Sequence, residues 1–115
     1  MSLKYSIEQE QETTIIALEG KITSDSDTVE LLENVQLQIE KKTKKIFFNL
    51  EKLDYISSSG LNFFVRMLTR SRSNQIELNL CALHGNVEKI FKISKLNEIF
   101  TIHPSLEEGI QKSTN

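Results

Sequence analysis

The 115-residue chain is short of the side chains that build metal centres and disulfides. It has one cysteine, Cys81, and two histidines, His84 and His103. A single cysteine forms neither an internal disulfide nor a cysteine-based metal cluster, and two histidines exclude a histidine-rich site. We therefore expect no metal and no cofactor. We interpret Cys81 as a small residue beside the sheet and both histidines as loop residues.

Long apolar runs and an excess of positive charge are also missing. No stretch approaches the ~20 apolar residues that cross a bilayer, and the first twelve residues contain no apolar segment like that of a signal peptide. These absences predict a cytoplasmic protein without membrane insertion. The formal net charge is −2, whereas a nucleic-acid binder usually carries a basic footprint. We expect no nucleic-acid partner.

The residues that are present suffice for one hydrophobic core. A chain of 115 residues with 38% hydrophobic residues suits one compact domain, since domains most often have roughly 100–150 residues. No internal repeat or low-complexity linker divides the chain, and the single proline, Pro104, lies near its end. We predict one domain over residues 1–115.

Short β-type segments recur along the chain. Two of them, residues 3–8 and 13–19, flank a polar stretch and end at Gly20, which predicts an N-terminal β-hairpin. Residues 46–50 read IFFNL and are almost wholly apolar, as in a central strand covered on both faces. Two more strands are expected over residues 76–81 and 99–102.

Helical patterns lie between these strands. Ser24 stands three residues before Asp27, a capping-box-like start, and the helix after it has an apolar stripe of Val29, Leu32, Val35 and Ile39. A second helix over residues 61–68 has a stripe of Leu61, Phe64, Val65 and Leu68. Two more helices are expected from Asn86 and from Ser105. Gly109 in the last one costs roughly 0.5–1 kcal/mol relative to alanine, so its end should fray.

The order of these elements predicts the fold class. After the hairpin, strands alternate with helices, and right-handed crossovers then build a mixed, largely parallel sheet. We predict an α/β domain with such a sheet, an N-terminal hairpin and about four helices. In open α/β sheets, binding sites lie beyond the carboxyl ends of the strands. The loop after the central strand, expected over residues 51–61, is therefore the candidate site.

That loop contains three consecutive serines, Ser57, Ser58 and Ser59, followed by Gly60 just before an apolar helix. One serine would cap the helix, and Gly60 would allow a close backbone approach. Capping does not require three serines. A helix N-terminus presents unpaired N–H groups and a partial positive charge, so it accommodates a phosphate group well. A phosphoserine in this first turn would change the surface charge without unfolding the domain.

The same segment resembles the signature of STAS domains, especially that of bacterial anti-sigma factor antagonists. The signature reads N-L-x-x-L-x-x-M-D-S-[ST]-G-L after a central strand, and residues 49–61 follow it. Residues 15–20, 81–83 and 90–96 are similar to further segments of the family. The resemblance covers nearly the full chain and implies a single STAS-like domain.

What the resemblance implies is a partner-switching cycle. Ser58 matches the phosphoacceptor of the family. Unphosphorylated, such a protein binds an anti-sigma factor serine kinase and so frees the sigma factor; phosphorylation breaks the complex, and a metal-dependent serine phosphatase restores it. The implied contact surface comprises Asp54, Ser57, Ser59, Gly60, Leu61 and Asn62, with Thr23, Ser24 and Asp25 at the nearby helix start.

Two positions depart from the family pattern. Ser57 stands where the signature has aspartate, so the carboxylate beside the acceptor is missing. The kinase supplies the metal, the nucleotide and the general base in phosphoryl transfer, so Ser58 can still accept a phosphate. Lys95 stands where the family often has glycine, which affects either a helix junction or a partner contact.

We do not expect an enzyme. The serines do not form a nucleophile elbow, because the first glycine of G-x-S-x-G is absent, and no phosphate-binding P-loop motif is present. The alternative is another non-catalytic role: a STAS accessory subunit of an ABC-type transporter or of a stress-signalling assembly. Such a subunit would dock through the same loop and the following helix without needing a phosphate.

Overall fold

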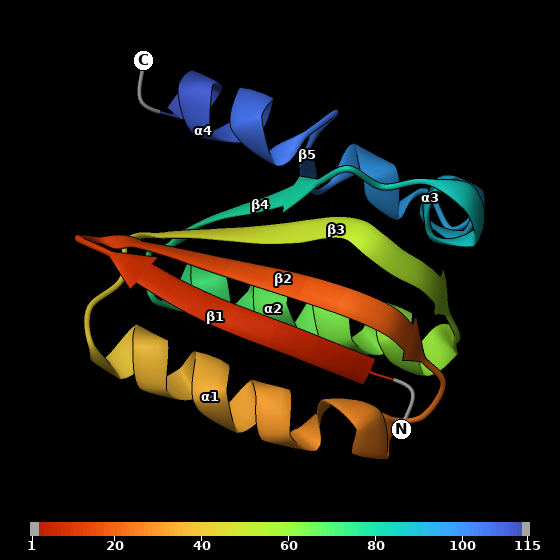
Figure 1. Ribbon diagram of the computed structural model, residues 1–115, viewed down its shortest axis with the longest axis horizontal. Helices are drawn as coiled ribbons and strands as arrows, with labels where there is room; N and C mark the ends of the chain where they lie inside the picture. The colour runs from red at the N-terminus through yellow and green to blue at the C-terminus, as the bar shows by residue number, and fades with distance from the viewer. Residues whose placement is uncertain (1–2, 114–115) are drawn as a thin grey trace.

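A five-stranded sheet in the order β1-β2-β3-β4-β5 runs through the computed structural model, which describes residues 3–113 (Figure 1). The strands β1 and β2 form an antiparallel hairpin, and the remaining neighbours are parallel. The predicted mixed, largely parallel sheet is therefore confirmed. The strand bounds are β1 (Leu3–Glu10), β2 (Thr13–Ile22), β3 (Lys45–Ile56), β4 (Glu77–Cys81) and β5 (Thr101–His103).

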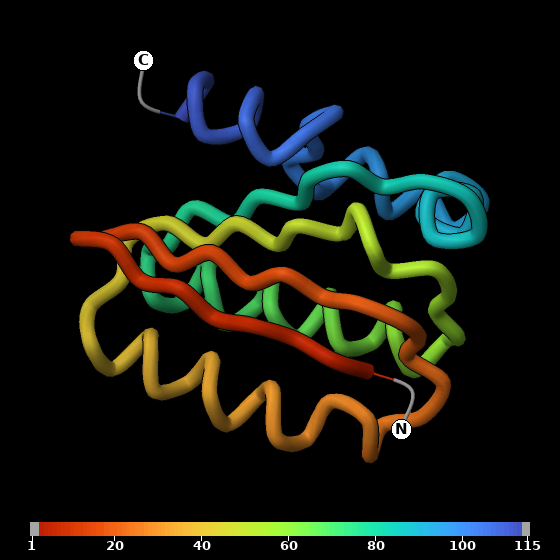
Figure 2. Tube along the Cα trace, viewed as in Figure 1, coloured from red at the N-terminus to blue at the C-terminus, as the bar shows by residue number. Residues whose placement is uncertain are grey.

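Within the described residues, three α-helices and two short 3₁₀ helices connect the strands and a fourth α-helix follows the last strand, in the order expected from the sequence. Their bounds are η1 (Asp25–Thr28), α1 (Val29–Glu40), α2 (Ser58–Ser73), α3 (Gly85–Ile93), η2 (Leu96–Glu98) and α4 (Leu106–Ser113). The helices α1 and α2 lie together along one face of the sheet, and α4 lies on the other side of it (Figures 1 and 2).

The main core lies between the sheet and the pair α1 and α2. Alternate residues of the strands point into it, and the face-to-edge contact of Phe48 with Phe64 (ring centroids 5.6 Å apart) joins the central strand to α2. A similar contact of Phe64 with Phe91 joins α2 to α3. Phe47, next to Phe48 in β3, is equally buried although it points to the opposite face. The prediction of a central strand covered on both faces is confirmed.

Several predicted boundaries and buried residues were wrong. The apolar stripe of α1 contains Leu31 rather than Val29, because Val29 is the first helical residue and is 54% exposed. In α2, the predicted Phe64 is buried, but Val65 is 38% exposed and the unpredicted Phe63 is buried instead. Ile99 precedes β5 and is 49% exposed.

The expected loop over residues 51–61 is mostly strand and helix. The strand β3 continues to Ile56, and α2 already begins at Ser58. The extension pairs with β2 through two shifts of register, between Ala17 and Glu19 and between Gly20 and Lys21. Such irregularities bend a strand and increase its twist.

The loop interpretation of His103 was wrong, whereas that of His84 is confirmed. His103 ends β5, is 8% exposed, and its Nε2 lies 2.9 Å from Asn79 Oδ1. Gly109 of α4 packs directly on it: a Cβ at this glycine would lie 2.9 Å from His103 Cδ2 and 3.0 Å from Cys81 Sγ. Glycine is used here for close packing of α4, a reason that the pattern of the sequence did not reveal. Cys81 is fully buried, and burial raises the pKa of its thiol to about 11.

Lys95 has a left-handed backbone conformation, with φ +62°. Glycine adopts this conformation without a steric penalty, which explains why a glycine suits the position. Lys95 lies at the junction of α3 and η2, one of the two features that the departure from the family pattern was expected to affect.

Candidate partner-binding site

Ser57 holds the turn between β3 and α2. Its backbone is extended (φ −95°, ψ −173°), and its hydroxyl accepts a hydrogen bond from the backbone N–H of Ser59 at 3.1 Å. This is the N-cap arrangement that satisfies one of the unpaired amides of a helix start. The predicted capping role of a serine in this segment is confirmed for Ser57.

Ser58 is the first residue of the 16-residue helix α2, and it is exposed. It lies at the carboxyl ends of the parallel strands, where the positive end of the helix dipole also points. The first turn of α2 contains no acidic residue. An enzyme approaching from solvent can therefore reach the side chain, and the local field favours an added anion.

Gly60 allows α2 to lie close to the end of β3. A Cβ at this position would lie 2.6 Å from Ile56 Cβ and 3.4 Å from Ile22 Cβ. Real Cβ atoms do not approach other carbon atoms to 2.6 Å, so any larger residue would force the helix away from the strand ends. Gly60 acts on the site by fixing the position of its helix.

The segment Thr23–Asp25 is brought to the same end of the molecule. The carboxylate of Asp27 accepts hydrogen bonds from Thr23 N at 2.8 Å and from Ser24 N at 3.2 Å. This fixes the start of η1, which packs against α2, and it confirms the predicted capping box. Figure 1 shows this connection beside the start of α2.

Three exposed apolar side chains lie on the elements that start or end at this site, and none of them is among the individually predicted contacts. Tyr55, near the end of β3, is 40% exposed, Val65 of α2 is 38% exposed, and Val29 of α1 is 54% exposed. Val65 follows Ser58 by seven residues and Asn62 follows it by four, so all three lie on one face of α2. A mixed polar and apolar surface of this kind suits a protein partner.

The amide group of Asn86 also contacts this site. Its Oδ1 accepts a hydrogen bond at 2.9 Å from Ile56 N, the residue before the Ser57 cap. On the other side of the turn, Ser57 N donates to Ile22 O at 2.9 Å. Asn86 was expected only to open a helix; it lies 30 residues away in sequence, so no local pattern could have identified this contact.

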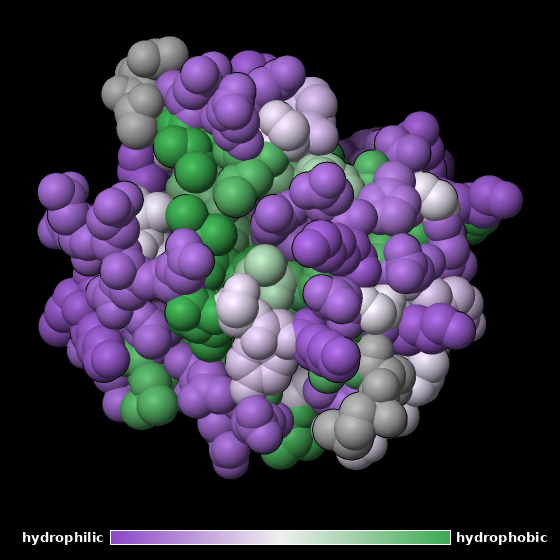
Figure 3. Space-filling model, in the orientation of Figure 1, coloured by the Kyte–Doolittle hydropathy of each residue, from purple (hydrophilic) through white to green (hydrophobic). Residues whose placement is uncertain are grey.

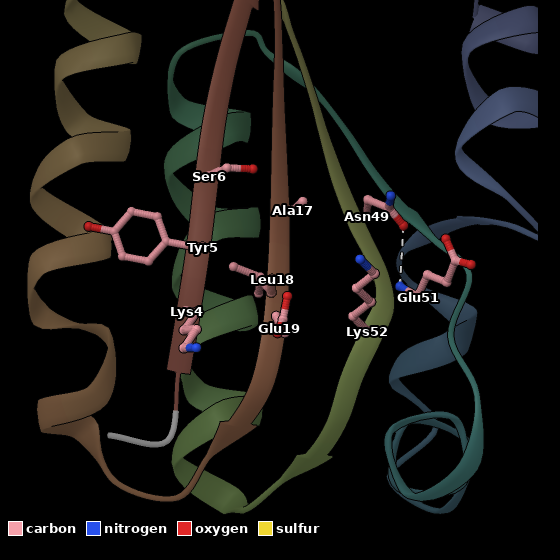
Figure 4. A pocket seen from close by; sticks show the side chains of 9 residues that line it. All are labelled: Lys4, Tyr5, Ser6, Ala17, Leu18, Glu19, Asn49, Glu51 and Lys52. Atoms are coloured by element: carbon pink, nitrogen blue, oxygen red, sulfur yellow. Dashed lines mark hydrogen bonds between the residues drawn. The ribbon is translucent and has the colours of Figure 1, made fainter.

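A shallow hollow of about 370 Å³ lies elsewhere, on the open face of the sheet (Figure 4). Lys4, Glu19, Glu51 and Lys52 place charges of both signs around it, and Asn49 Oδ1 accepts a hydrogen bond from Glu51 N at 3.2 Å. Figure 3 shows hydrophobic surface in the middle of this face, beside α4. None of the predicted site residues lines the hollow.

Two absences within residues 3–113 bear on other functions. No helix in this range is long and apolar enough to cross a membrane. No group of three or more histidine, cysteine, aspartate or glutamate side chains in the same range is arranged to hold a metal ion.

Comparison with known sequences identifies the family of the chain. Residues 4–109 match the family model of the STAS domain. The putative anti-sigma factor antagonist BtrV of Bordetella bronchiseptica is 30% identical over 105 residues, which is 91% of this chain and 90% of BtrV. The anti-sigma-B factor antagonist of Staphylococcus aureus is 29% identical over 92 residues, covering 77% of this chain and 85% of the relative.

Solved structures show the same fold. An anti-sigma factor antagonist from Mycobacterium paratuberculosis superposes with a TM-score of 0.82 at 15% identity, over 99% of this chain and 96% of that one. SpoIIAA in its unphosphorylated form gives 0.83 at 20% identity, over 96% of each chain. The phosphorylated form of the Bacillus cell fate determinant SpoIIAA gives 0.74 at 21% identity, over 96% of this chain and 99% of that one. The chain belongs to the STAS domain family, and its relatives there are anti-sigma factor antagonists.

Proposed function

We propose that this protein is a phosphorylation-controlled anti-sigma factor antagonist. In its unphosphorylated form it binds an anti-sigma factor serine kinase, and phosphorylation of Ser58 releases that kinase. The observation that carries the proposal is the position of Ser58, exposed at the start of α2 and surrounded by the mixed surface described above. A metal-dependent serine phosphatase would return the protein to its binding form, and the cycle would take place in the cytoplasm.

The switch depends on the charge that a phosphate brings. A phosphoserine carries about −1.5 to −2 charges at neutral pH, and in a complex this charge would lie among the contacts made by Tyr55 and Val65. Burying an unpaired charge in an interface is strongly unfavourable. The domain itself tolerates the phosphate, because it is added at the positive end of a helix.

The proposed contact surface divides into residues that touch the partner and residues that hold the surface in shape. Asp54, Asn62, Thr23 and Asp25 are exposed and are proposed as direct contacts. Ser57 and Gly60 are assigned to the second group because of their capping and packing roles. The remaining proposed contacts, all half-buried, are Ser24, Ser59 and Leu61.

Phosphorylation by an anti-sigma kinase encoded in the same genome tests the proposal. The protein is incubated with the kinase and ATP, and its intact mass is measured. We expect one phosphate on the wild-type protein and on the matched control Ser59→Ala, and none on Ser58→Ala. A phosphate that enters Ser58→Ala at the normal level contradicts the assignment. If no kinase modifies the protein and it instead co-purifies with an ABC permease, the accessory-subunit alternative is correct.

A further inference from the structure

The end of β3 projects beyond its neighbour β4. The last pair between the two strands joins Asn49 to Cys81, whereas β3 continues to Ile56. Residues 50–56 therefore form an overhang that has β2 on one side and, among residues 3–113, no strand on the other. Figure 1 shows this part of β3 curving away from β4 and passing close to α3. Ser58 lies two residues beyond the overhang, so the position of the acceptor depends on it.

His84, the residue before α3, and Asn86, in its first turn, make the backbone contacts that a neighbouring strand would otherwise make. His84 Nε2 lies 2.7 Å from the carbonyl oxygen of Glu51, and Asn86 Oδ1 lies 2.9 Å from the backbone nitrogen of Ile56. A carbonyl oxygen only accepts hydrogen bonds, so His84 Nε2 is the donor. An amide oxygen only accepts, so Asn86 receives the N–H of Ile56. One donor and one acceptor thus satisfy backbone groups near the two ends of the overhang.

The helix that supplies these side chains is itself firmly attached. Val87 and Phe91 of α3 are fully buried in the main core, and Phe91 stacks edge-on against both Phe64 and Phe100. Gly85, between the two contacting residues, has φ +53°. Glycine favours this conformation, which turns the chain between His84 and Asn86.

We propose that His84 and Asn86 are positioning residues for Ser58, bracing the overhang of β3 in place of a neighbouring strand. The hydrogen bonds of His84 and Asn86 fix the position of the Ser57 cap relative to the sheet. Ser58 is therefore presented to the kinase in one conformation. Without this brace, formed by the hydrogen bonds of His84 and Asn86, the turn between β3 and α2 samples other conformations. Only the molecules in the binding-competent conformation then bind the kinase. Removal of either side chain therefore raises the KM of phosphorylation and weakens the complex with the kinase, whereas kcat changes little. This inference rests on the proposed function of Ser58.

Amide hydrogen exchange tests the brace without any partner. The net contribution of one hydrogen bond to stability corresponds to roughly a fivefold to tenfold change in an equilibrium constant. We expect the amide of Ile56 to exchange about fivefold to tenfold faster in Asn86→Ala than in the wild type. Asn86→Asp keeps an acceptor oxygen and should restore slow exchange. Lys89→Ala, an exposed change on the same helix, is the matched control and should leave the rate unchanged.

Phosphorylation kinetics test the consequence. We expect KM to rise about threefold to tenfold in Asn86→Ala and His84→Ala, with kcat within a factor of two. His84→Gln, which retains an N–H donor, should recover most of the lost efficiency. Thermal unfolding identifies variants whose whole fold is destabilised. If Asn86→Ala fails to fold, His84→Ala and His84→Gln provide the same comparison at an exposed residue.

The possible failures are distinct. Unchanged exchange at Ile56 in Asn86→Ala, or an unchanged KM in both alanine variants, overturns the positioning role. Absence of phosphorylation on the wild-type protein contradicts the proposed function, while the exchange data still report on the brace. A loss of kcat at constant KM would assign the pair to the reaction step and would also overturn the inference.

Discussion

Two helices of this protein, α2 and α4, begin in the same way. Ser57 caps α2 and Ser105 caps α4, each with a hydroxyl that accepts a backbone hydrogen bond at 3.1 Å. Each helix also carries a glycine pressed against the sheet. A Cβ would lie 2.6 Å from the nearest side-chain atom at Gly60 and 2.9 Å at Gly109.

The two starts differ in charge. The first turn of α4 contains Glu107 and Glu108, whereas that of α2 contains no acidic residue. Carboxylates in a first turn interact favourably with the helix dipole. The two helices therefore share two features, a serine cap and a glycine packed against the sheet. Of the two, only α2 has no negatively charged side chain in its first turn. This difference distinguishes α4 from α2, the helix at whose start we propose that a phosphate is added.

Replacing the two docking glycines gives the largest expected effects. Overpacking typically costs 1–3 kcal/mol. We expect Gly60→Ala to lower the free energy of unfolding by about 2–3 kcal/mol, because the contacting Ile56 Cβ is fixed to the backbone. Gly109→Ala should cost about 1 kcal/mol less, since its neighbours are side-chain atoms of His103 and Cys81 that can shift. Urea unfolding measures both; equal losses would show that the two contacts are equally rigid.

Removing the caps should affect both helices alike. Loss of a serine N-cap costs about 1 kcal/mol, so Ser57→Ala and Ser105→Ala should lower the free energy of unfolding by similar amounts. Ser57→Asn and Ser105→Asn, which keep a capping acceptor, serve as controls and should remain near the wild type. A lower free energy of unfolding in only one of the two alanine variants would show that the two caps are not equivalent.

Phosphorylation should affect the melting temperature differently in two versions of the α2 cap. Phosphoserine placed at position 58 during synthesis should leave the melting temperature unchanged or raise it slightly in the wild type and in Ser57→Asn. In Ser57→Asp it should lower the melting temperature, because a carboxylate and a phosphate then compete for the same helix end. Salt should reduce the contrast. The same change in melting temperature in Ser57→Asp and Ser57→Asn would show that a carboxylate at position 57 does not affect the stability of the phosphorylated protein.

The smallest effect concerns pH at the end of α4. Burial raises the pKa of Glu77, but hydrogen bonds from Ser113 and Asn79 outweigh it, and the pKa lies below its ordinary value. The stabilisation is therefore present above the unfolded-state pKa and is lost as pH falls through the folded-state pKa. Thermal melts at descending pH should show a smaller acid-induced loss in Glu77→Gln than in the wild type. Identical pH profiles would show that this contact contributes nothing.

Local patterns predicted the features that depend on neighbouring residues. The caps at Ser24 and Ser105, and a cap by one of the three serines at 57–59, were recognisable because an N-cap is formed within three or four residues. The central strand was recognisable because residues 46–50 are apolar without interruption. These features place Ser58 at the start of a helix, which is the main element of the site.

The features that the sequence did not reveal depend on distant contacts. The extension of β3 contains Glu51, Lys52 and Asp54, whose polarity suggested a loop, and it becomes a strand because β2 pairs with it. The contact of Asn86 with Ile56 spans 30 residues. His103 is buried where Gly109 of α4 packs on it, and its Nε2 contacts Asn79, 24 residues away in sequence.

The most direct test of the account is the affinity of the anti-sigma kinase for the two forms of the protein. Calorimetric titration compares the unphosphorylated protein with the protein carrying phosphoserine at position 58, at the same salt concentration. We predict binding at least about 100-fold weaker for the phosphorylated form, as expected when a charge is buried without a partner. Equal affinities, with both forms folded, would contradict the claim that a phosphate on Ser58 controls the complex.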